Sequence, residues 1–211
     1  MNSDLEDYIE AHISPQPVYL SKIDRDTNLH FLNGRMCSGH IQGRLLKMLT
    51  AMINPERVIE LGTFTGFSAL CIAEALNENA VVHTIECNDE LEEVILNNIS
   101  LSPHREKIIL HIGDAIKEMK KYAPNFFDLG VIDADKRDYP AYFKEMIRII
   151  RPGGYILADN TLWDGHVTET TPHSSQTKGI IEFNELVAHF PGVEVAMIPL
   201  RDGITIIRKL I

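Results

Sequence analysis

The sequence is poor in cysteine and has no excess of positive charge. Its 211 residues include three cysteines, Cys37, Cys71 and Cys87, with no C-x-x-C spacing. This odd number leaves no complete disulfide framework, and we expect Cys71 and Cys87 to be buried thiols in core elements. The formal net charge of -10 argues against nucleic acid as the main partner, because a phosphate backbone is bound by clustered Lys and Arg.

Long hydrophobic runs are also absent. No run approaches the roughly 18 apolar residues that a membrane span needs, and the start MNSDLEDYIE lacks the basic and apolar regions of a signal peptide. We therefore expect a cytoplasmic protein with no membrane partner. A content of 45% hydrophobic and 24% charged residues predicts one globular domain covering residues 1–211.

Short apolar runs alternate with segments of helical spacing. The runs expected as strands are RVIEL, VVHTIE, KIILHI, DLGVID, GYILAD, VEVAMIP and GITIIRKL. Helical crossovers between the first five predict a mostly parallel α/β sheet with helices on both faces. Only LRDG separates the last two runs, so they are expected to form an antiparallel hairpin through Asp202 and Gly203. Residues 1–55 predict a helical N-terminal extension, in which Ser38 could cap a helix.

Acidic residues follow the ends of the first five expected strands, where a doubly wound sheet binds its ligand. They are Glu60, Glu86, Asp114, Asp133 and Asp159. A single carboxylate at such a position is usually a helix cap. Five carboxylates at the same ends of five neighbouring strands favour a ligand-binding site at that edge of the sheet.

The loop after the first strand reads VIELGTFTGFS, with Gly62 and Gly66 four residues apart. A nicotinamide dinucleotide would favour G-x-G-x-x-G, which lets bare backbone meet the pyrophosphate. Glu60 would repel a pyrophosphate, whereas it would attract the amino group of a methionine moiety. Glu86, about twenty residues after Gly66, can accept hydrogen bonds from ribose hydroxyls. The acids therefore favour S-adenosylmethionine.

Three oxygen-bearing side chains follow the fourth and fifth expected strands. Asp133 lies in VIDADKRDY, and Asp159 and Asn160 lie in ILADNTLWDG. Carboxylates and an amide without His or Cys suit Mg²⁺, Mn²⁺ or Ca²⁺ rather than zinc. The nine histidines show no H-x-x-x-H pair. In the alternative interpretation, Asp133 caps a turn and Asp159–Asn160 only begins a loop.

The segments ELGTFTGFS, GDA, DADKRDY and DNTLWDG together resemble the cation-dependent class I O-methyltransferases, a group that includes caffeoyl-CoA O-methyltransferases and, more distantly, catechol O-methyltransferase. The resemblance runs from about residue 30 to the C-terminus. It implies a Rossmann-like, seven-stranded methyltransferase sheet and a homodimer. Arg44 departs from the family pattern, because the family usually has Gly-Gln where this sequence has Gly43-Arg44.

The resemblance also implies roles for individual residues. It places S-adenosylmethionine against Ser38, Glu60, Gly62, Thr63, Ser68, Glu86, Asp114, Ala115 and Asp135. It assigns the divalent cation to Asp133, Asp159 and Asn160, and the general base to Lys136. Asp133 is thereby both a metal residue and part of the catalytic centre.

The chemistry of these residue types predicts a small phenolic acceptor. A divalent ion that chelates two adjacent hydroxyls lowers their pKa and fixes the attacking oxygen, so a vicinal diol is expected. Lys136 close to the cation would be a good base, although it could instead be a surface lysine that pairs with Asp135 or Asp138. Trp163 could flank a planar substrate or pack beneath its loop. The polar segment TETTPHSSQTKGI, residues 168–180, resembles a substrate-side loop.

Two other classes of function remain open at this point. A nicotinamide-dependent oxidoreductase would use the same edge of the sheet, but the missing G-x-G-x-x-G motif counts against it. A noncatalytic nucleotide-binding protein on a Rossmann-like fold would need neither Lys136 nor the three oxygen donors. The sequence favours an S-adenosylmethionine-dependent O-methyltransferase over both.

Overall fold

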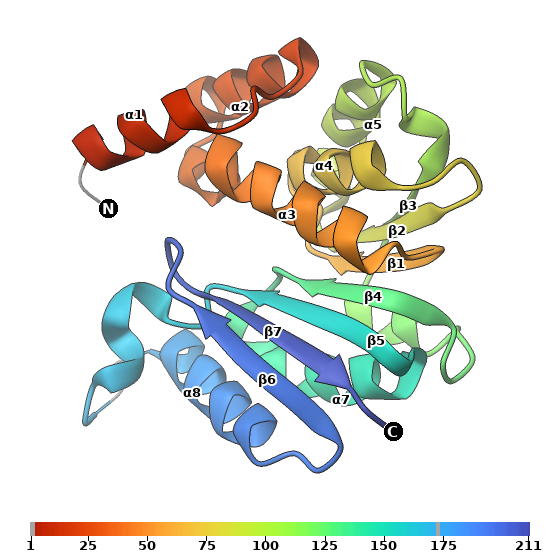
Figure 1. Cartoon of the computed structure of the whole chain (residues 1–211), viewed down its shortest axis with the longest axis vertical. Helices are drawn as coiled ribbons and strands as arrows, with labels where there is room; N and C mark the ends of the chain where they lie inside the picture. The colour runs from red at the N-terminus through yellow and green to blue at the C-terminus, as the bar shows by residue number, and fades with distance from the viewer. Residues whose placement is uncertain (1–2, 172–173) are drawn as a thin grey trace.

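A seven-stranded sheet forms the centre of the protein in a computed structural model that describes residues 3–171 and 174–211. The strand order is β3-β2-β1-β4-β5-β7-β6 (Figure 1). The strands are β1 (Arg57–Leu61), β2 (Val81–Glu86), β3 (Ile108–Ile112), β4 (Phe127–Ile132), β5 (Ile150–Asp159), β6 (Val193–Ile198) and β7 (Ile204–Lys209). The first five pair in parallel, and β7 runs antiparallel to both β5 and β6. The predicted α/β sheet with a C-terminal hairpin is confirmed.

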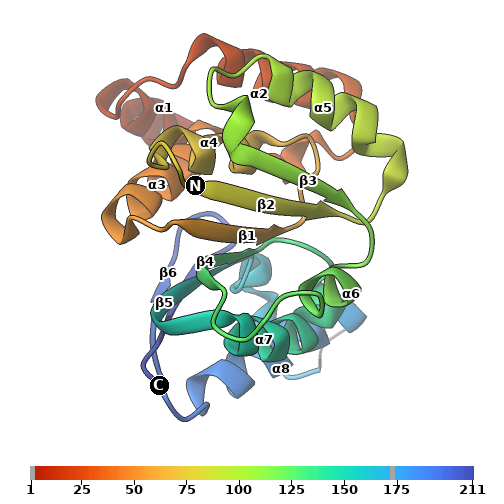
Figure 2. The same cartoon turned by 90° about the vertical axis from the view of Figure 1, so that its right-hand side faces the viewer.

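Helices cover both faces of this sheet, as the alternating pattern predicts. They are α1 (Ser3–His12), α2 (Val18–His30), α3 (Gly39–Ile53), α4 (Phe67–Ala75), α5 (Glu92–Ser100), α6 (Ala115–Met119), α7 (Tyr139–Ile149) and α8 (Ser175–Ala188). Short 3-10 segments are η1 (Gly34–Met36), η2 (Asp89–Leu91), η3 (Arg105–Lys107), η4 (Lys136–Asp138) and η5 (Trp163–Thr168). Helices α1 to α5 lie on one side of the sheet and α6 to α8 on the other (Figures 1 and 2).

Two buried clusters fill the spaces between the sheet and its helices. One lies under α7 and α8 and includes Ile59 of β1 and Phe143 of α7. The other lies under α3 and α4 and includes Val58 of β1 and Leu46 of α3. Val58 and Ile59 belong to different clusters because successive side chains of a strand point to opposite faces. The helix α2 adds a third cluster against α4.

Three local expectations differ from the structure. Cys71 is buried as predicted, but Cys87 is exposed, because it comes one residue after β2 ends. Ser38 precedes α3 with an αR conformation, and its side chain makes no capping hydrogen bond. The segment 168–180 is only partly a loop, since Ser174 accepts the Thr177 N–H and caps α8. Residues 172–173 of that segment lie outside the described residues.

The central pairing of β1 with β4 brings the two main loops of the candidate site together. Leu61 pairs with Ile132, and the Asp133 N–H donates to the Leu61 carbonyl at 2.9 Å. Gly62 has a φ of +91°, and a Cβ there would lie 2.0 Å from the Asp133 carbonyl oxygen. The group that approaches Gly62 most closely is therefore protein backbone.

None of the helices in the described ranges has the length and apolar composition of a membrane span.

Gly62→Ala should destabilise the protein strongly. The new Cβ would clash with the Asp133 carbonyl, which is backbone and cannot move away by rotating a side chain, and alanine would have to keep a left-handed φ. We therefore expect a loss of about 3–5 kcal/mol in the free energy of unfolding. Urea denaturation measures it. Gly165→Ala is the matched control, because Gly165 has a φ of +82° but no atom within 4 Å of the place that its Cβ would take. Equal losses in both variants would contradict the crowding at Gly62.

Candidate active site

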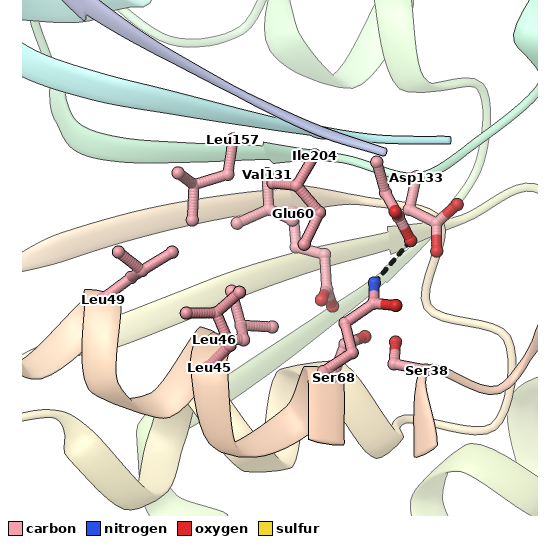
Figure 3. Close-up of a pocket in the computed structure, with 12 residues that line it drawn as sticks. Ser38, Leu45, Leu46, Leu49, Glu60, Ser68, Val131, Asp133, Leu157 and Ile204 are labelled. Atoms are coloured by element: carbon pink, nitrogen blue, oxygen red, sulfur yellow. Dashed lines mark hydrogen bonds between the residues drawn. The ribbon is translucent and has the colours of Figure 1, made fainter. Parts of the chain in front are cut away.

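A cavity at the carboxyl ends of the central strands collects many of the predicted site residues. Its lining comes from α3, α4 and the strands β1, β4, β5 and β7 (Figure 3). The polar lining residues are Ser38, Gln42, Glu60, Ser68, Asp133 and Asp159, and the apolar ones are Leu45, Leu46, Leu49, Val131, Leu157 and Ile204. Five predicted residues thus meet in one cavity, with polar groups gathered at one end and leucines at the other (Figure 3).

Strand alternation explains why three acids converge there. Glu60 follows Val58 by two residues, and the same step separates Val131 from Asp133 and Leu157 from Asp159. The three apolar residues belong to the cluster under α3 and α4. Residues two apart share a face of the sheet. The acids therefore point to the side that α3 and α4 cover.

Glu60 is a fully buried carboxylate with an unused acceptor. Its side chain is 0% exposed. Oε2 accepts the Thr84 hydroxyl at 2.6 Å, and Oε1 has no hydrogen-bond partner among the described residues. Burial raises the pKa of Glu60 to about 7, with a smaller opposing effect from the hydroxyls of Thr84 and Ser68. A buried carboxylate with an unused oxygen is suited to a ligand that brings a cationic donor.

Glu86 holds the loop that follows β1. Its Oε2 accepts the N–H groups of Thr63 at 3.2 Å and Phe64 at 2.8 Å, and its Oε1 accepts the Asn88 N–H at 2.9 Å. The side chain is 7% exposed. Oε2 thus accepts two N–H groups already, and because a carboxylate can accept about four hydrogen bonds, the remaining acceptor capacity lies on Oε1, whose other neighbour is the weakly donating Cys87 thiol at 3.7 Å. The predicted contact with a ribose stays compatible with this arrangement.

Asp114, after β3, and Asp135, three residues after the end of β4, act as helix caps, as single carboxylates at such positions usually do. Asp114 is exposed and accepts the Lys117 N–H at 2.8 Å, at the start of α6. Asp135 accepts the Arg137 N–H at 3.0 Å and pairs with the Arg137 guanidinium. Ala115 is buried as the first residue of α6. Their predicted contacts with a cofactor stay predictions.

Asp133 and Asp159 lie close together at the ends of neighbouring strands. Burial and the negative charge of Asp133 raise the pKa of Asp159. Asp159 accepts the Gln42 amide at 2.6 Å (Figure 3, dashed line) and the Asn160 N–H at 2.8 Å. Asn160 follows with a φ of 59°. The donor set consists of oxygen atoms alone, which fits a hard divalent cation.

The candidate set contains only two carboxylates and one amide. Among the described residues, no group of three or more His, Cys, Asp or Glu side chains is placed to hold a metal ion. The candidate set supplies none of the nitrogen and sulfur ligands that zinc prefers.

Lys136 faces the acids of the cavity. Its Nζ lies 2.8 Å from Asp133 Oδ1, and its side chain is 13% exposed. The alternative pairing with Asp135 or Asp138 is not the one observed, because Arg137 occupies Asp135. The lysine therefore lies at the predicted catalytic centre.

Trp163 packs against the core. It contacts the buried cluster under α7 and α8 and has a φ of 46°. It is not among the residues that line the cavity. These contacts match the packing alternative, and a contact with an acceptor stays a prediction.

Three residues of the site are not among the sequence predictions. Gln42 lines the cavity and is 6% exposed, Thr84 donates to Glu60, and the Tyr139 hydroxyl donates to the Asp159 carbonyl oxygen at 3.0 Å. Gln42 follows Ser38 by one helical turn and precedes Leu45 and Leu46. A polar residue on the apolar face of an amphipathic helix was the signal available in the sequence.

Arg44 has a structural explanation. Its guanidinium pairs with both oxygens of Glu74 on α4, at 3.2 and 2.8 Å. Lys47 contacts the same carboxylate at 2.6 Å. The residue that departs from the family pattern thus ties α3 to α4, away from the cavity lining.

Sequence comparison places the chain among known enzymes. A family model described as O-methyltransferase matches residues 10–210. A protein of Arabidopsis thaliana named as a probable caffeoyl-CoA O-methyltransferase is 33% identical over 215 residues, which cover 96% of this chain and 91% of that protein. Caffeoyl-CoA O-methyltransferase 1 of Eucalyptus globulus is 33% identical over 214 residues, with coverages of 96% and 86%.

Solved structures agree with this placement. The O-methyltransferase of Bacillus cereus, in a complex with SAH, is 26% identical with a TM-score of 0.90, and the match covers 98% of this chain and 97% of that one. The family model covers nearly the whole sequence, and both plant relatives exceed 30% identity. The chain belongs to the O-methyltransferase family that includes the caffeoyl-CoA O-methyltransferases.

Proposed function

We propose that this protein transfers a methyl group from S-adenosylmethionine to one hydroxyl of a vicinal diol on a small phenolic acceptor, and that the reaction requires a divalent cation. The observation that carries the proposal is the meeting of Asp133, Asp159 and Lys136 beside the cavity of Glu60. A catechol-like or caffeoyl-type acceptor is consistent with the names of the plant relatives.

The cofactor part of the proposal is supported by the loop after β1. The unused Oε1 of Glu60 suits the methionine ammonium. Glu86, which accepts an N–H of the same loop, would also accept hydrogen bonds from the ribose hydroxyls. The Bacillus cereus neighbour, whose structure contains SAH, has the same fold. Methyl transfer is favoured over the nicotinamide and noncatalytic alternatives, since the named relatives are O-methyltransferases.

Asp133, Asp159 and Asn160 would hold the cation, most suitably Mg²⁺. When bound, S-adenosylmethionine supplies an electrophilic methyl group, and the cation lowers the pKa of the two chelated hydroxyls and orients them. Lys136 Nζ, which lies 2.8 Å from Asp133, is within reach of a hydroxyl held at these residues. We propose that it takes the proton of the attacking hydroxyl.

Chelation should abolish methyl transfer to a vicinal diol, and added Mg²⁺ or Mn²⁺ should restore it. Activity is measured over a panel of vicinal diphenols that includes CoA thioesters, with matched monophenols. Asp159→Ala should behave like the chelated protein, whereas Asp26→Ala, on α2 with a side chain that is 43% exposed, should not. Full activity in a demonstrably metal-free preparation would overturn the metal requirement while leaving a methyltransferase.

Glu60→Gln should weaken the binding of SAH by about 1.5–3 kcal/mol, because a charge-assisted hydrogen bond is lost. The pKa of Glu60 is raised to about 7, so the affinity of the unmodified protein should fall as the pH drops below about 7 and the carboxylate is protonated. Calorimetry between pH 6 and 8 tests both effects, and the variant should lose this pH dependence. A folded variant with unchanged affinity would place the ammonium elsewhere.

Lys136→Met should lower kcat by about 10²–10⁴-fold, the usual contribution of a general base. The Kd for SAH should stay near its original value, because the lysine faces Asp133 and not Glu60. Lys144→Met, on the exposed side of α7, serves as the control. Normal turnover of Lys136→Met across neutral pH would show that the hydroxyl needs no lysine.

A further inference from the structure

The turn between β6 and β7 is bonded to the loop that carries the metal residues. The N–H groups of Leu162 and Trp163 donate to the Asp202 carbonyl at 2.7 and 3.1 Å, and the Thr161 N–H donates to the Gly203 carbonyl at 3.1 Å. These bonds begin one residue after Asn160. The turn is therefore part of the support of the site, although it lies far away in the sequence.

Arg201 in this turn has a backbone conformation that an arginine rarely adopts. Its φ is 48°, in the left-handed region that favours glycine and asparagine. A strained residue persists where the surrounding structure over-determines it, and such residues cluster at functional sites. The shape of the turn would favour glycine or asparagine at this position, so the presence of an arginine needs a separate explanation.

The Arg201 guanidinium spans from the turn to the segment before α3. Nη2 donates to the Arg35 carbonyl at 3.0 Å, and Nη1 donates to the carbonyls of Cys37, at 3.0 Å, and Ser38. Nη1 also lies 3.4 Å from Gln42 Oε1. One side chain thus joins the C-terminal hairpin to the start of the helix that lines the cavity.

The contact with Gln42 determines which way the Gln42 amide points. With Oε1 toward the guanidinium, Nε2 faces Asp159 and donates to its Oδ2 at 2.6 Å. The reversed amide would turn its N–H groups toward the cation of Arg201 and its oxygen toward the carboxylate of Asp159. Both contacts would then be repulsive, so the two charges enforce one orientation.

This orientation leaves Asp159 ready for a cation. Oδ1 accepts the Asn160 N–H and Oδ2 accepts the Gln42 amide, which holds the plane of the carboxylate and leaves a lone pair on each oxygen. Hydrogen-bond partners of this kind orient the side chains that bind metals and tune their affinity.

We propose that Arg201 is a positioning residue that acts through Gln42 to orient Asp159 for the divalent cation. The inference rests on the cation site of the proposed function. It adds that the C-terminal turn and the helix α3 jointly determine the affinity of that site for its ion.

The test is the binding of Mn²⁺ alone, measured by electron paramagnetic resonance without cofactor or acceptor. Arg201→Asn removes the guanidinium and keeps a residue that tolerates the left-handed turn. It should weaken Mn²⁺ binding about 10-fold or more. Arg208→Asn, in which an exposed pair with Glu194 on the same hairpin is lost, should bind Mn²⁺ like the unchanged protein.

A double-mutant cycle separates positioning from a general effect on stability. Gln42→Leu leaves the turn untouched and should weaken Mn²⁺ binding to a similar extent. The double variant should lose no more than either single variant, because both changes interrupt one chain of contacts. Thermal melting of each variant shows whether a change in affinity accompanies a loss of fold.

The outcomes distinguish a failure of the cation site from a failure of the positioning role of Arg201. If the unchanged protein binds no Mn²⁺, the cation site and the positioning role are both wrong. If it binds Mn²⁺ and Arg201→Asn binds equally well, the cation site stands and the role of Arg201 is overturned. Additive losses in the double variant would overturn the route through Gln42, and non-additive losses would support it.

Discussion

The parallel pairing of β1 with β4 is the constraint on which the site depends. It joins two halves of the sheet whose crossovers lead away in opposite directions, so the loops after β1 and β4 open a cleft between them. The contact is close enough that Gly62 has no room for a side chain beside the Asp133 carbonyl. The residues assigned to the cofactor and those assigned to the cation are thus held next to each other by backbone, which no rearrangement of side chains can separate.

The polar side chains around this junction form a set in which negative charge is only partly balanced. Glu60 is buried with one oxygen unpaired among the described residues, and Asp133 repels Asp159 even though Lys136 pairs with Asp133. Such an arrangement costs stability in the free protein. It also creates a place where an ammonium group and a divalent ion would both be stabilised. The expected ligands would therefore supply the positive charge that these buried carboxylates lack in the protein alone.

The strands and the acidic residues at their ends could be predicted from the sequence. Short apolar runs identify the strands, and the acids at their ends follow from reading where each apolar run stops. Helix ends and loop contacts were harder. Cys87 lies outside because β2 ends one residue earlier, and the segment 168–180 turns into α8 halfway along. Local composition does not reveal where a helix begins when its capping residue sits in a polar stretch.

Residue order alone dictates the alternation of strands and helices, the row of acids at one edge of the sheet and the oxygen-only character of the candidate metal residues. These features can be predicted from the sequence, because strand periodicity decides which side chains share a face. The partners of those acids are set by three-dimensional packing instead. Gln42 meets Asp159 across 117 positions of sequence, and Arg201 meets Ser38 across 163. Such contacts depend on how a helix and a hairpin pack around a sheet, and no local pattern encodes them.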